Sequence, residues 1–535
     1  MAVSRQNFHR KAYFVLLSLL LVATTCSNFV MNLAWVFLAL NWIIEGDFRR
    51  KASRLVSCRL LHAYLALFLL LCVGMFWSSC WSYGLDYLRK MMPLLFVPLV
   101  VLTSEPVSRT DLRRLLILYV TAVFIVSIIG LVRCIAMPNL PYREIVPFIS
   151  HIRFSLNVCF SIVLLLYETV RLVSHRKVWR VTECLVLVCW FLYFLLLLQS
   201  YTAYVVLFVV AAVVLPAFLL RRLSRGWRWC VMLMFVMLVG GVGGAVVSMV
   251  RDYYNLIPLA RKPLASCTEN GAAYRHEQDG LIENGNFVNN YICEEELSRA
   301  WLARTGQSIY GRNDDGYETV WTLIRYMNAK GLTKDSVGVW CLTEQDLASI
   351  SSGIANPIYL RRASLRRMVY VMLYVKDSYV IEGKVAGSSV MQRVELWRAS
   401  CRVLSRHWLF GVGTGDVVEA CHAELRSMQS SLADNAMHPH CQYLSFLLAF
   451  GVLGFCVVSF LFVRAFVGTG AKADVLLVAH VVIVLVSFVS EDTLETLAGC
   501  MFVVALNVVL SAASVTREGK MRGASSFTDE KSLLN

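Results

Sequence analysis

Two histidines stand directly before a long apolar run in the C-terminal part of the chain. They lie in the segment Met437-His438-Pro439-His440-Cys441. A histidine at the border of a membrane helix titrates near neutral pH and can act as a general base. A capping role at the helix border is one alternative. A metal site that adds Asp434 is a weaker one, because the spacing matches no usual ligand set. We prefer the interpretation as a general base, which needs neither a metal nor a cofactor.

Arginines suited to hold an anion occur at two other places. Arg393 follows Gln392, and Arg153 stands two residues after His151 at the start of another apolar run. A guanidinium binds phosphate oxygens through two parallel N–H groups and stays charged at physiological pH. Anchoring of His151 and Arg153 at the membrane border by snorkelling is the alternative.

Two further segments combine chemically capable residues. The run Gly411-Val412-Gly413-Thr414-Gly415-Asp416 indicates a close backbone approach, either to an anion or in a plain structural turn. No strand and helix typical of nucleotide binding surround it. The acidic run Ser490-Glu491-Asp492-Thr493-Leu494-Glu495 is either a solvated turn or holds the basic groups of a site in place.

The elements that must position these residues are membrane helices. Of the 535 residues, 58% are hydrophobic and 16% are charged, whereas an average soluble protein has about 25% charged residues. A membrane helix needs roughly 20 mainly apolar residues. Twelve segments meet this need, at about residues 12–27, 29–45, 59–77, 86–104, 113–133, 151–169, 181–199, 201–220, 229–249, 441–465, 474–490 and 495–513. The sequence predicts an all-α polytopic membrane protein with about 12 transmembrane helices.

Short basic loops set the expected orientation. Loops rich in Lys and Arg stay on the cytoplasmic side, and such loops follow every second predicted helix, as at Arg49 to Arg54 and Arg221 to Arg228. Both termini are therefore expected in the cytoplasm, and the long connection between the ninth and tenth helices is expected outside. The net charge of +15 favours anionic membrane lipids over nucleic acid as a partner.

This topology divides the chain into four expected parts. They are a membrane domain at 1–249, a large extracytoplasmic insertion at 250–440, further membrane helices at 441–513 and a cytoplasmic tail at 514–535. Inside the insertion, Tyr359 to Tyr379 mixes four arginines with apolar residues, which suits an amphipathic helix at the membrane surface or an ordinary surface helix. The arginines are Arg361, Arg362, Arg366 and Arg367.

The order of these motifs resembles the O-antigen ligase and polymerase superfamily, which are integral-membrane glycosyltransferases of the C type. The motifs are Arg393-xxx-Trp397, Phe410 to Asp416, His440-Cys441 followed by Gly451-xx-Gly454, His151-Ile-Arg153, Tyr87-Leu-Arg89-Lys90 and the Glu491 turn. In the insertion, four segments resemble the branch found in Bacteroidetes. They are Glu283-Asn-Gly285, Thr322 to Met327, Lys330-Gly-Leu and Gly353 to Asn356.

The resemblance implies a reaction and roles for particular residues. The family moves a glycan from an undecaprenyl diphosphate carrier to an acceptor hydroxyl, without metal, at the periplasmic face of the bacterial inner membrane. His440 matches the family base, and Arg393 matches the arginine that holds the diphosphate. The family has an arginine after helix seven that holds the second phosphate. In this chain Gln199-Ser200-Tyr201 stands at that place, and Arg153 is expected to take over the role. The other residues expected to contact substrate are His151, His438, Arg89, Lys90, Tyr201 and Glu491.

Transfer of a polymerised glycan to lipid A-core is the first hypothesis for this chain. A polymerase that extends the lipid-linked glycan and a ligase that uses a protein acceptor share the fold and stay open. A transporter is less favoured, because almost no charged residues fall near the middle of the predicted helices. An assembly factor without chemistry is favoured only by the loss of the family arginine at Tyr201.

Overall fold

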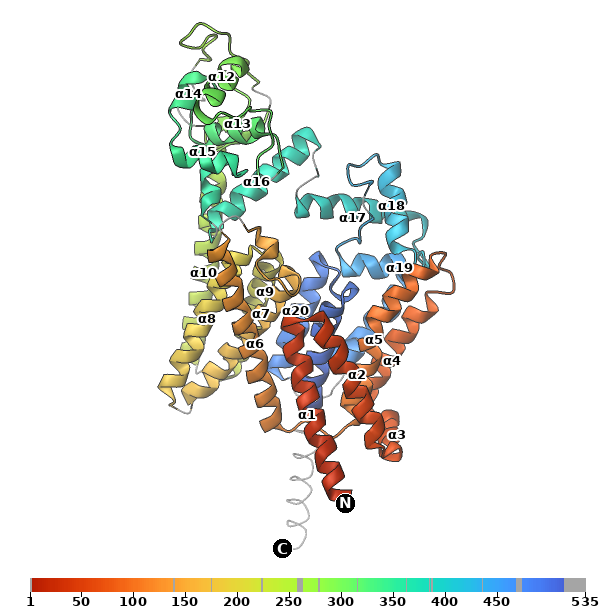
Figure 1. Cartoon of the computed structure of the whole chain (residues 1–535). Helices are drawn as coiled ribbons and strands as arrows, with labels where there is room; N and C mark the ends of the chain where they lie inside the picture. Colours follow the sequence, from red (N-terminus) through yellow and green to blue (C-terminus); the bar gives the residue numbers. More distant parts are fainter. Residues whose placement is uncertain are drawn as a thin grey trace. The chain divides into compact units, whose positions relative to one another are not determined.

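The computed structural model describes residues 2–137, 140–174, 176–222, 225–256, 263–277, 280–314, 316–361, 363–383, 385, 388–434, 436–467 and 474–513 (Figure 1). Within these ranges the only strands are the short pair β1 (Ile282–Glu283) and β2 (Asn286–Phe287). The expectation of an all-α protein is therefore confirmed. The chain forms two compact units, one of residues up to Arg228 together with those from Gln392 onward, and one of Trp229–Met391.

The first unit consists of long helices. Their bounds are α1 Ala2–Cys26, α2 Asn28–Glu45, α3 Phe48–Ser57, α4 Arg59–Val73, α5 Trp81–Thr103, α6 Arg109–Ala136, α7 His151–Ser174, α8 Val178–Leu198, α9 Tyr201–Arg222, α17 Ser389–Arg406, α18 Val417–Ser427, α19 Gln442–Val467 and α20 Val475–Ser490, with the 3₁₀ turns η1 Tyr142–Glu144 and η3 Thr493–Glu495. A last apolar helix covers Leu497–Ala513.

Each of the twelve predicted apolar segments coincides with a helix. By length and composition, six helices in the described ranges are able to cross a membrane. They lie at Asn28–Glu45, Arg109–Ala136, His151–Val173, Val178–Leu198, Met232–Tyr254 and Gln442–Arg464. The pair α3 and α4, bent by 84°, raises this number to seven if it is one broken span. The multi-pass membrane character is thus supported, while the count of about 12 crossings stays a prediction.

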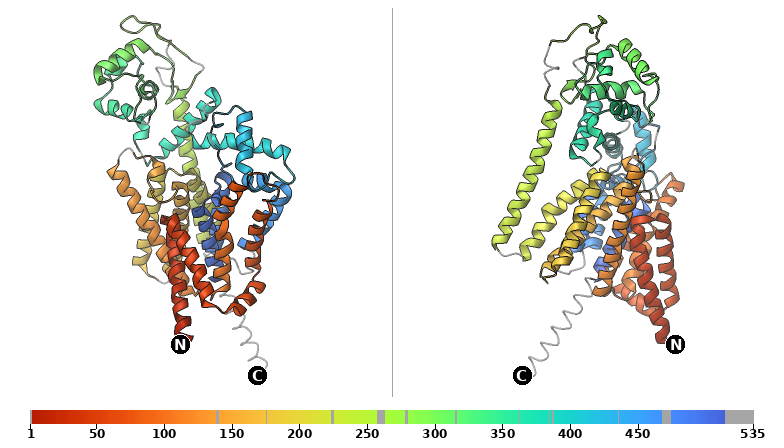
Figure 2. Two further views of the ribbon diagram at one scale, coloured as in Figure 1. Left: turned by 45° about the vertical axis from the view of Figure 1, so that its right-hand side comes forward. Right: turned by 60° about the vertical axis from the view of Figure 1, so that its left-hand side comes forward.

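The last helix is the centre of the first unit. Every residue from Ala498 to Ala513 is buried, as expected for a helix that is apolar on all sides. Its Asn507 accepts a hydrogen bond from the Tyr64 hydroxyl of α4 at 2.6 Å. In Figures 1 and 2 this segment, drawn in blue, lies among the other helices of its unit. It thereby fixes the loop that precedes it, residues 490–496, at one end of the helix bundle.

The glycine-rich turn packs on protein backbone. The amide N–H of Val412 donates to the carbonyl oxygen of Leu448 at 2.7 Å, and a Cβ on Gly411 (φ +72°) would lie 2.3 Å from that same oxygen. Helix α19 is interrupted at Gly451, where φ is 61° and ψ is −169°. Only glycine adopts such a conformation readily. The turn is therefore structural, which was one of the two expected roles.

The second unit contains α10 and a small helical domain. Its elements are α10 Arg225–Tyr254, α12 Glu294–Thr305, α13 Thr319–Ala329, α14 Ser336–Trp340, α15 Glu344–Ser351, η2 Pro357–Leu360 and α16 Leu365–Glu382. The segments that resemble the Bacteroidetes branch meet inside it. Glu283 is fully buried. Its carboxylate accepts hydrogen bonds from Nε and Nη2 of Arg325 at 3.0 and 3.1 Å and from the side-chain amide of Asn356 at 2.8 Å. Removal of either partner of this ion pair would leave an uncompensated buried charge in the domain.

Helix α16 covers most of the expected amphipathic segment. Its Arg366 pairs with Asp252 at 3.1 Å, while Arg362 lies outside the described residues. Placement of this helix at a membrane surface stays a prediction, as do the part boundaries at 249, 440 and 513. The expected cytoplasmic tail at 514–535 also lies outside the described residues.

Candidate active site

The acidic loop at residues 490–496 brings three of the expected site residues together. Glu491 forms an ion pair with the Arg393 guanidinium of α17, and its other oxygen lies 3.5 Å from Nη1 of Arg153 on α7. The Arg393 Nε–H donates to the carbonyl oxygen of Ser490 at 2.8 Å. One buried carboxylate thus lies between two guanidinium groups. The alternative in which the acidic run holds basic groups in place is therefore the one observed.

Arg153 is turned into the loop. Its Nη2 donates to the carbonyl oxygen of Asp492 at 2.7 Å, and its Nε donates to the Thr496 hydroxyl at 3.2 Å. The residue is 7% exposed. A buried guanidinium needs partners for its N–H groups, and here the loop supplies them. The contacts of Arg153 therefore fix the path of the loop.

His440 is held by the same loop. Its backbone lies in the left-handed region (φ 52°), which non-glycine residues adopt rarely and often at functional sites. The backbone N–H donates to Oδ2 of Asp492 at 2.6 Å, and Nδ1 of the ring lies 3.6 Å from that oxygen. The Ser445 hydroxyl donates to the other oxygen of Asp492 at 2.9 Å. Asp492 thus holds the backbone of His440 by a hydrogen bond and lies near Nδ1 of its ring.

The surroundings favour a neutral imidazole at His440. Burial lowers the pKa of this ring below its usual value, and the charges of Arg393 and Arg153 lower it further, against the opposing effect of Asp492 and Glu491. Its side chain nevertheless remains 38% exposed. A neutral, partly accessible imidazole backed by a carboxylate can accept a proton at neutral pH.

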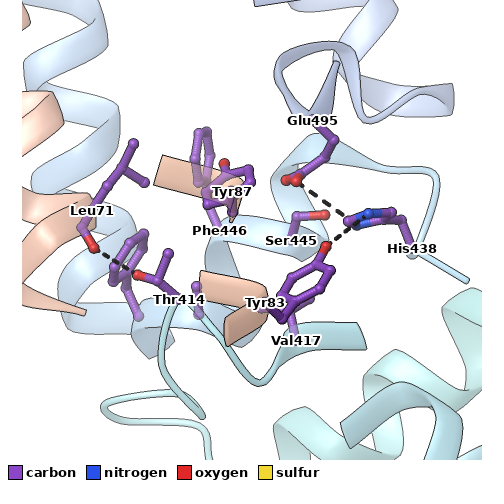
Figure 3. A pocket seen from close by; sticks show the side chains of 11 residues that line it. Leu71, Tyr83, Tyr87, Thr414, Val417, His438, Ser445, Phe446 and Glu495 are labelled. Atoms are coloured by element: carbon purple, nitrogen blue, oxygen red, sulfur yellow. Dashed lines mark hydrogen bonds and ion pairs between the residues drawn. The ribbon is translucent and has the colours of Figure 1, made fainter. Parts of the chain in front are cut away.

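His438 lies in a separate pocket, which we call the His438 pocket (Figure 3). The pocket is lined by Leu71, Tyr83, Tyr87, Thr414, Val417, His438, Ser445, Phe446, Ala449, Phe450 and Glu495. The ring Nε2 is 2.8 Å from the Tyr83 hydroxyl, and Nδ1 is 3.8 Å from Glu495. Burial raises the pKa of the Glu495 carboxyl to about 8. The two histidines therefore face two different carboxylates of one short loop.

The remaining expected residues lie at several places in the first unit. Arg89 and Lys90 both pair with Asp86, at 2.6 and 2.7 Å. The charge of Lys90 lowers the pKa of both His438 and Glu495, which indicates that Lys90 lies near the His438 pocket. The Arg89 side chain is 77% exposed.

His151 and Tyr201 stand at the starts of α7 and α9. The His151 ring meets the Tyr142 ring edge-on, with centroids 5.4 Å apart. Tyr201 begins α9, and the hydroxyl of its neighbour Thr202 is 3.0 Å from that of Ser490. The start of α7 therefore lies close to η1, and the start of α9 lies close to the acidic loop.

Sequence reasoning missed two residues of this region. Tyr83 shares one face of α5 with Tyr87 and Lys90, and this helical spacing was a signal that could have identified it. Arg143 lies in η1, where its guanidinium is 5.7 Å from the Tyr142 ring. Its charge acts on His151 together with those of Arg153 and Arg393. An arginine beside a tyrosine in a short loop was the corresponding signal.

A metal site finds no support in the described ranges. No three His, Cys, Asp or Glu side chains in these ranges converge closely enough to hold an ion. His438 and His440 each face one carboxylate of the 490–496 loop instead. Metal-independent chemistry stays a prediction.

One segment of the chain is similar to a known protein family. Residues 358–459 match the family model described as O-antigen ligase. The matched segment contains Arg393, the glycine-rich turn, His438, His440 and Gly451. No curated protein matches the chain. Over this segment the chain is therefore similar to the O-antigen ligases and polymerases.

Proposed function

We propose that this protein is an O-antigen ligase, which transfers a surface glycan from undecaprenyl diphosphate to a hydroxyl of lipid A-core. The reaction takes place at the periplasmic face of the bacterial inner membrane. The observation that carries the proposal is the acidic loop, which holds a base, His440, and two arginines, Arg393 and Arg153, in one cluster. These are the groups that transfer from a lipid diphosphate requires.

The acceptor side of the reaction rests on His440. The acceptor oxygen attacks the anomeric carbon of the glycan, and its proton passes to Nε2 of His440. Asp492, 3.6 Å from Nδ1, stabilises the imidazolium that forms. His440 is thus the catalytic base, and Asp492 is a positioning residue.

The donor side needs a cationic seat, because the bond from the anomeric carbon to the diphosphate oxygen breaks and its electron pair leaves with the diphosphate. Arg393, which like Arg153 donates to the loop, has the more exposed side chain of the two, 14% against 8%, and contacts the diphosphate in our proposal. The N–H groups of Arg153 are engaged by the loop, so Arg153 contributes its positive charge and the position of Glu491. From the sequence, both arginines were expected to bind the phosphates directly. In this proposal only Arg393 does so.

Arg143 supplies a second phosphate contact in this scheme. It is exposed, and no ion pair in the described part of the chain engages it. Its neighbour Tyr142 packs against His151, two residues before Arg153 on α7. Tyr201 replaces the arginine that the family places after helix seven, so a cation is needed from another element. The short η1 loop provides it.

The other expected residues have supporting roles. His151, which the charges of Arg143, Arg153 and Arg393 reach, contacts the first sugar of the donor. Lys90 stands near the His438 pocket, and Tyr201 and Arg89 contribute contacts at the edge of the site. No nucleic acid and no cofactor enter this reaction.

A deletion strain tests the proposal. Loss of the protein should leave free lipid A-core together with accumulated lipid-linked polymer. Single repeat units on the core would instead assign the chain to the polymerases, and an unmodified glycoprotein beside normal lipopolysaccharide would assign it to the ligases with a protein acceptor. Normal surface glycans of every kind would contradict the proposed reaction class.

A further inference from the structure

Two segments of the first unit that are far apart in the sequence are joined by hydrogen bonds. They are residues 74–81, which lead from α4 into α5, and residues 408–416, which lead from α17 into α18. The backbone N–H of Thr414 donates to the carbonyl oxygen of Gly74 at 3.1 Å. The carboxylate of Asp416 accepts hydrogen bonds from two successive backbone N–H groups of the first segment, both at 2.7 Å. We call the two segments the joined loops, because they form one structural element.

The joined loops pack into the interruption of α19 at Gly451. The backbone N–H of Val452 donates to the carbonyl oxygen of Trp408 at 2.8 Å, and the N–H of Val412 donates to the carbonyl oxygen of Leu448 at 2.7 Å. A break in a helix leaves backbone groups that need other partners, and here the loop supplies them. Irregular backbone is tolerated at a membrane where protein satisfies its polar groups. The joined loops therefore meet this condition beside a helix that is long and apolar enough to cross a membrane.

Large aromatic side chains of the joined loops are exposed. We call them the aromatic patch, and their exposed fractions lie between 42% and 81%. The members are Phe76, Trp77, Trp81, Trp408 and Phe410. A group of exposed apolar side chains of this size marks a surface that contacts a partner or a membrane.

The joined loops carry almost no charge. Residues 74–81 and 408–415 contain no Asp, Glu, Lys or Arg, and the carboxylate of Asp416 is turned onto backbone amides. Surfaces that bind a soluble protein usually have a polar rim around an apolar centre. Tryptophan without neighbouring charges is instead typical of the boundary of a bilayer, where the ring contacts acyl chains and its N–H reaches water. The composition of the loops therefore favours lipid as the partner.

The aromatic patch continues the exposed apolar faces of the neighbouring helices. Leu69 of α4, Leu85 of α5, and Val452 and Leu453 of α19 are all exposed. Val452 is also the residue that is bonded to Trp408. Lipid that covers these helix faces in a membrane would reach the aromatic patch without a gap in the apolar surface.

We propose that the aromatic patch lies in the boundary layer of the bilayer and contacts lipid there, so that it fixes the depth of the joined loops. The partner is ordinary membrane phospholipid, and the inference does not depend on the proposed reaction. Since the joined loops hold the break at Gly451, the patch also fixes the depth of the first part of α19. His440 and Ser445 lie just before this break, so the candidate site is held close to the level of the lipid headgroups.

Lipid photo-crosslinking tests the contact in the unaltered, full-length protein in phospholipid nanodiscs. The probes are two phosphatidylcholines that carry a diazirine, one beside the headgroup and one at the end of an acyl chain, and tandem mass spectrometry locates the adducts. Residues 76–81 and 408–410 should react more strongly with the headgroup-proximal probe. Phe460, exposed further along α19, is the internal control and should prefer the chain-end probe. Adducts at Phe460 without adducts in the aromatic patch, or a patch that prefers the chain-end probe, would overturn the proposal.

Tryptophan emission gives a second test that names the rival partners. Brominated phosphatidylcholine quenches tryptophans in contact with lipid, and acrylamide quenches those in contact with water. The variant Trp77→Phe/Trp81→Phe/Trp408→Phe, which keeps an aromatic ring at each place, should lose emission that the brominated lipid quenches. Trp340→Phe is the matched control, because Trp340 is exposed on α14 with the Arg304 guanidinium 5.4 Å from its ring. It should lose emission that acrylamide quenches.

The other outcomes of the emission test contradict the proposal. If the triple variant loses emission that acrylamide quenches, the aromatic patch faces water. If it loses emission that neither agent quenches, protein covers the patch, as a second copy of the chain would. Thermal unfolding of the triple variant with the wild-type Tm shows that the comparison is made on folded protein.

Discussion

The backbone N–H of His440 donates to Oδ2 of Asp492 at 2.6 Å, and Nδ1 of the same histidine lies 3.6 Å from that oxygen. A single carboxylate thus holds the left-handed backbone of His440 and faces its ring. His440 lies in the segment before α19, and Asp492 lies in the loop after α20. Their pairing links the path of the acidic loop to the position of the proposed base.

Replacement of Asp492 by Asn should lower kcat by about 10²-fold or more, because general-base catalysis contributes about 10² to 10⁴ and the imidazolium loses its counter-charge. The Asp492 charge raises the pKa of His440, so its removal should move the acid limb of the pH profile of kcat to lower pH. The pH profile of kcat at saturating substrates measures both effects. A shift of the acid limb to higher pH would contradict the pairing.

Replacement of Glu491 by Gln should destabilise the folded protein. It leaves Arg153, which is 7% exposed, without its counter-charge, and removing one partner of a buried ion pair costs roughly 3–5 kcal/mol. Thermal unfolding in detergent measures the loss. Glu419→Gln, an exposed acid on α18, is the control and should leave Tm unchanged. Equal Tm values for both variants would show that Glu491 does not hold the two arginines.

Replacement of Arg143 by Gln should raise the KM for the lipid-linked donor about tenfold or more. A hydrogen bond to a charged group contributes roughly 1.5–3 kcal/mol, and 1.4 kcal/mol corresponds to about a factor of ten. Arg143→Lys should recover only part of the affinity, because a point charge does not reproduce the guanidinium fork. The KM for the acceptor should not change. Wild-type donor KM in Arg143→Gln would remove Arg143 from the phosphate site.

The helices were largely predictable, because spanning a membrane demands long apolar runs. Helix α3 was not, since Arg49, Lys51 and Arg54 made this segment read as a basic cytoplasmic loop. In the structure, Arg54 donates to the carbonyl oxygen of Thr103 at 3.0 Å, so part of the charge serves packing at the end of α5. A tertiary contact of this kind leaves no periodic signal in the sequence.

The residues of the candidate site were predictable from the sequence. The contacts among them were less predictable. Arg393, Arg153, Glu491 and His440 carried recognisable motifs, and the acidic loop does bring them together. The engagement of Arg153 by that loop joins residues about 340 positions apart, and the contact of Tyr83 with His438 spans 355 positions. Such contacts depend on the packing of the last helix, which no local pattern specifies.

The most direct test of the account is kcat of His440→Gln at saturating donor and rough lipopolysaccharide, for protein whose Tm matches the wild type. The account predicts a decrease of about 10²- to 10⁴-fold, with the KM values for both substrates nearly unchanged. His438→Gln, measured beside it, should lower kcat by a smaller factor. Wild-type kcat in a folded His440→Gln protein would contradict the assignment of His440 as the base.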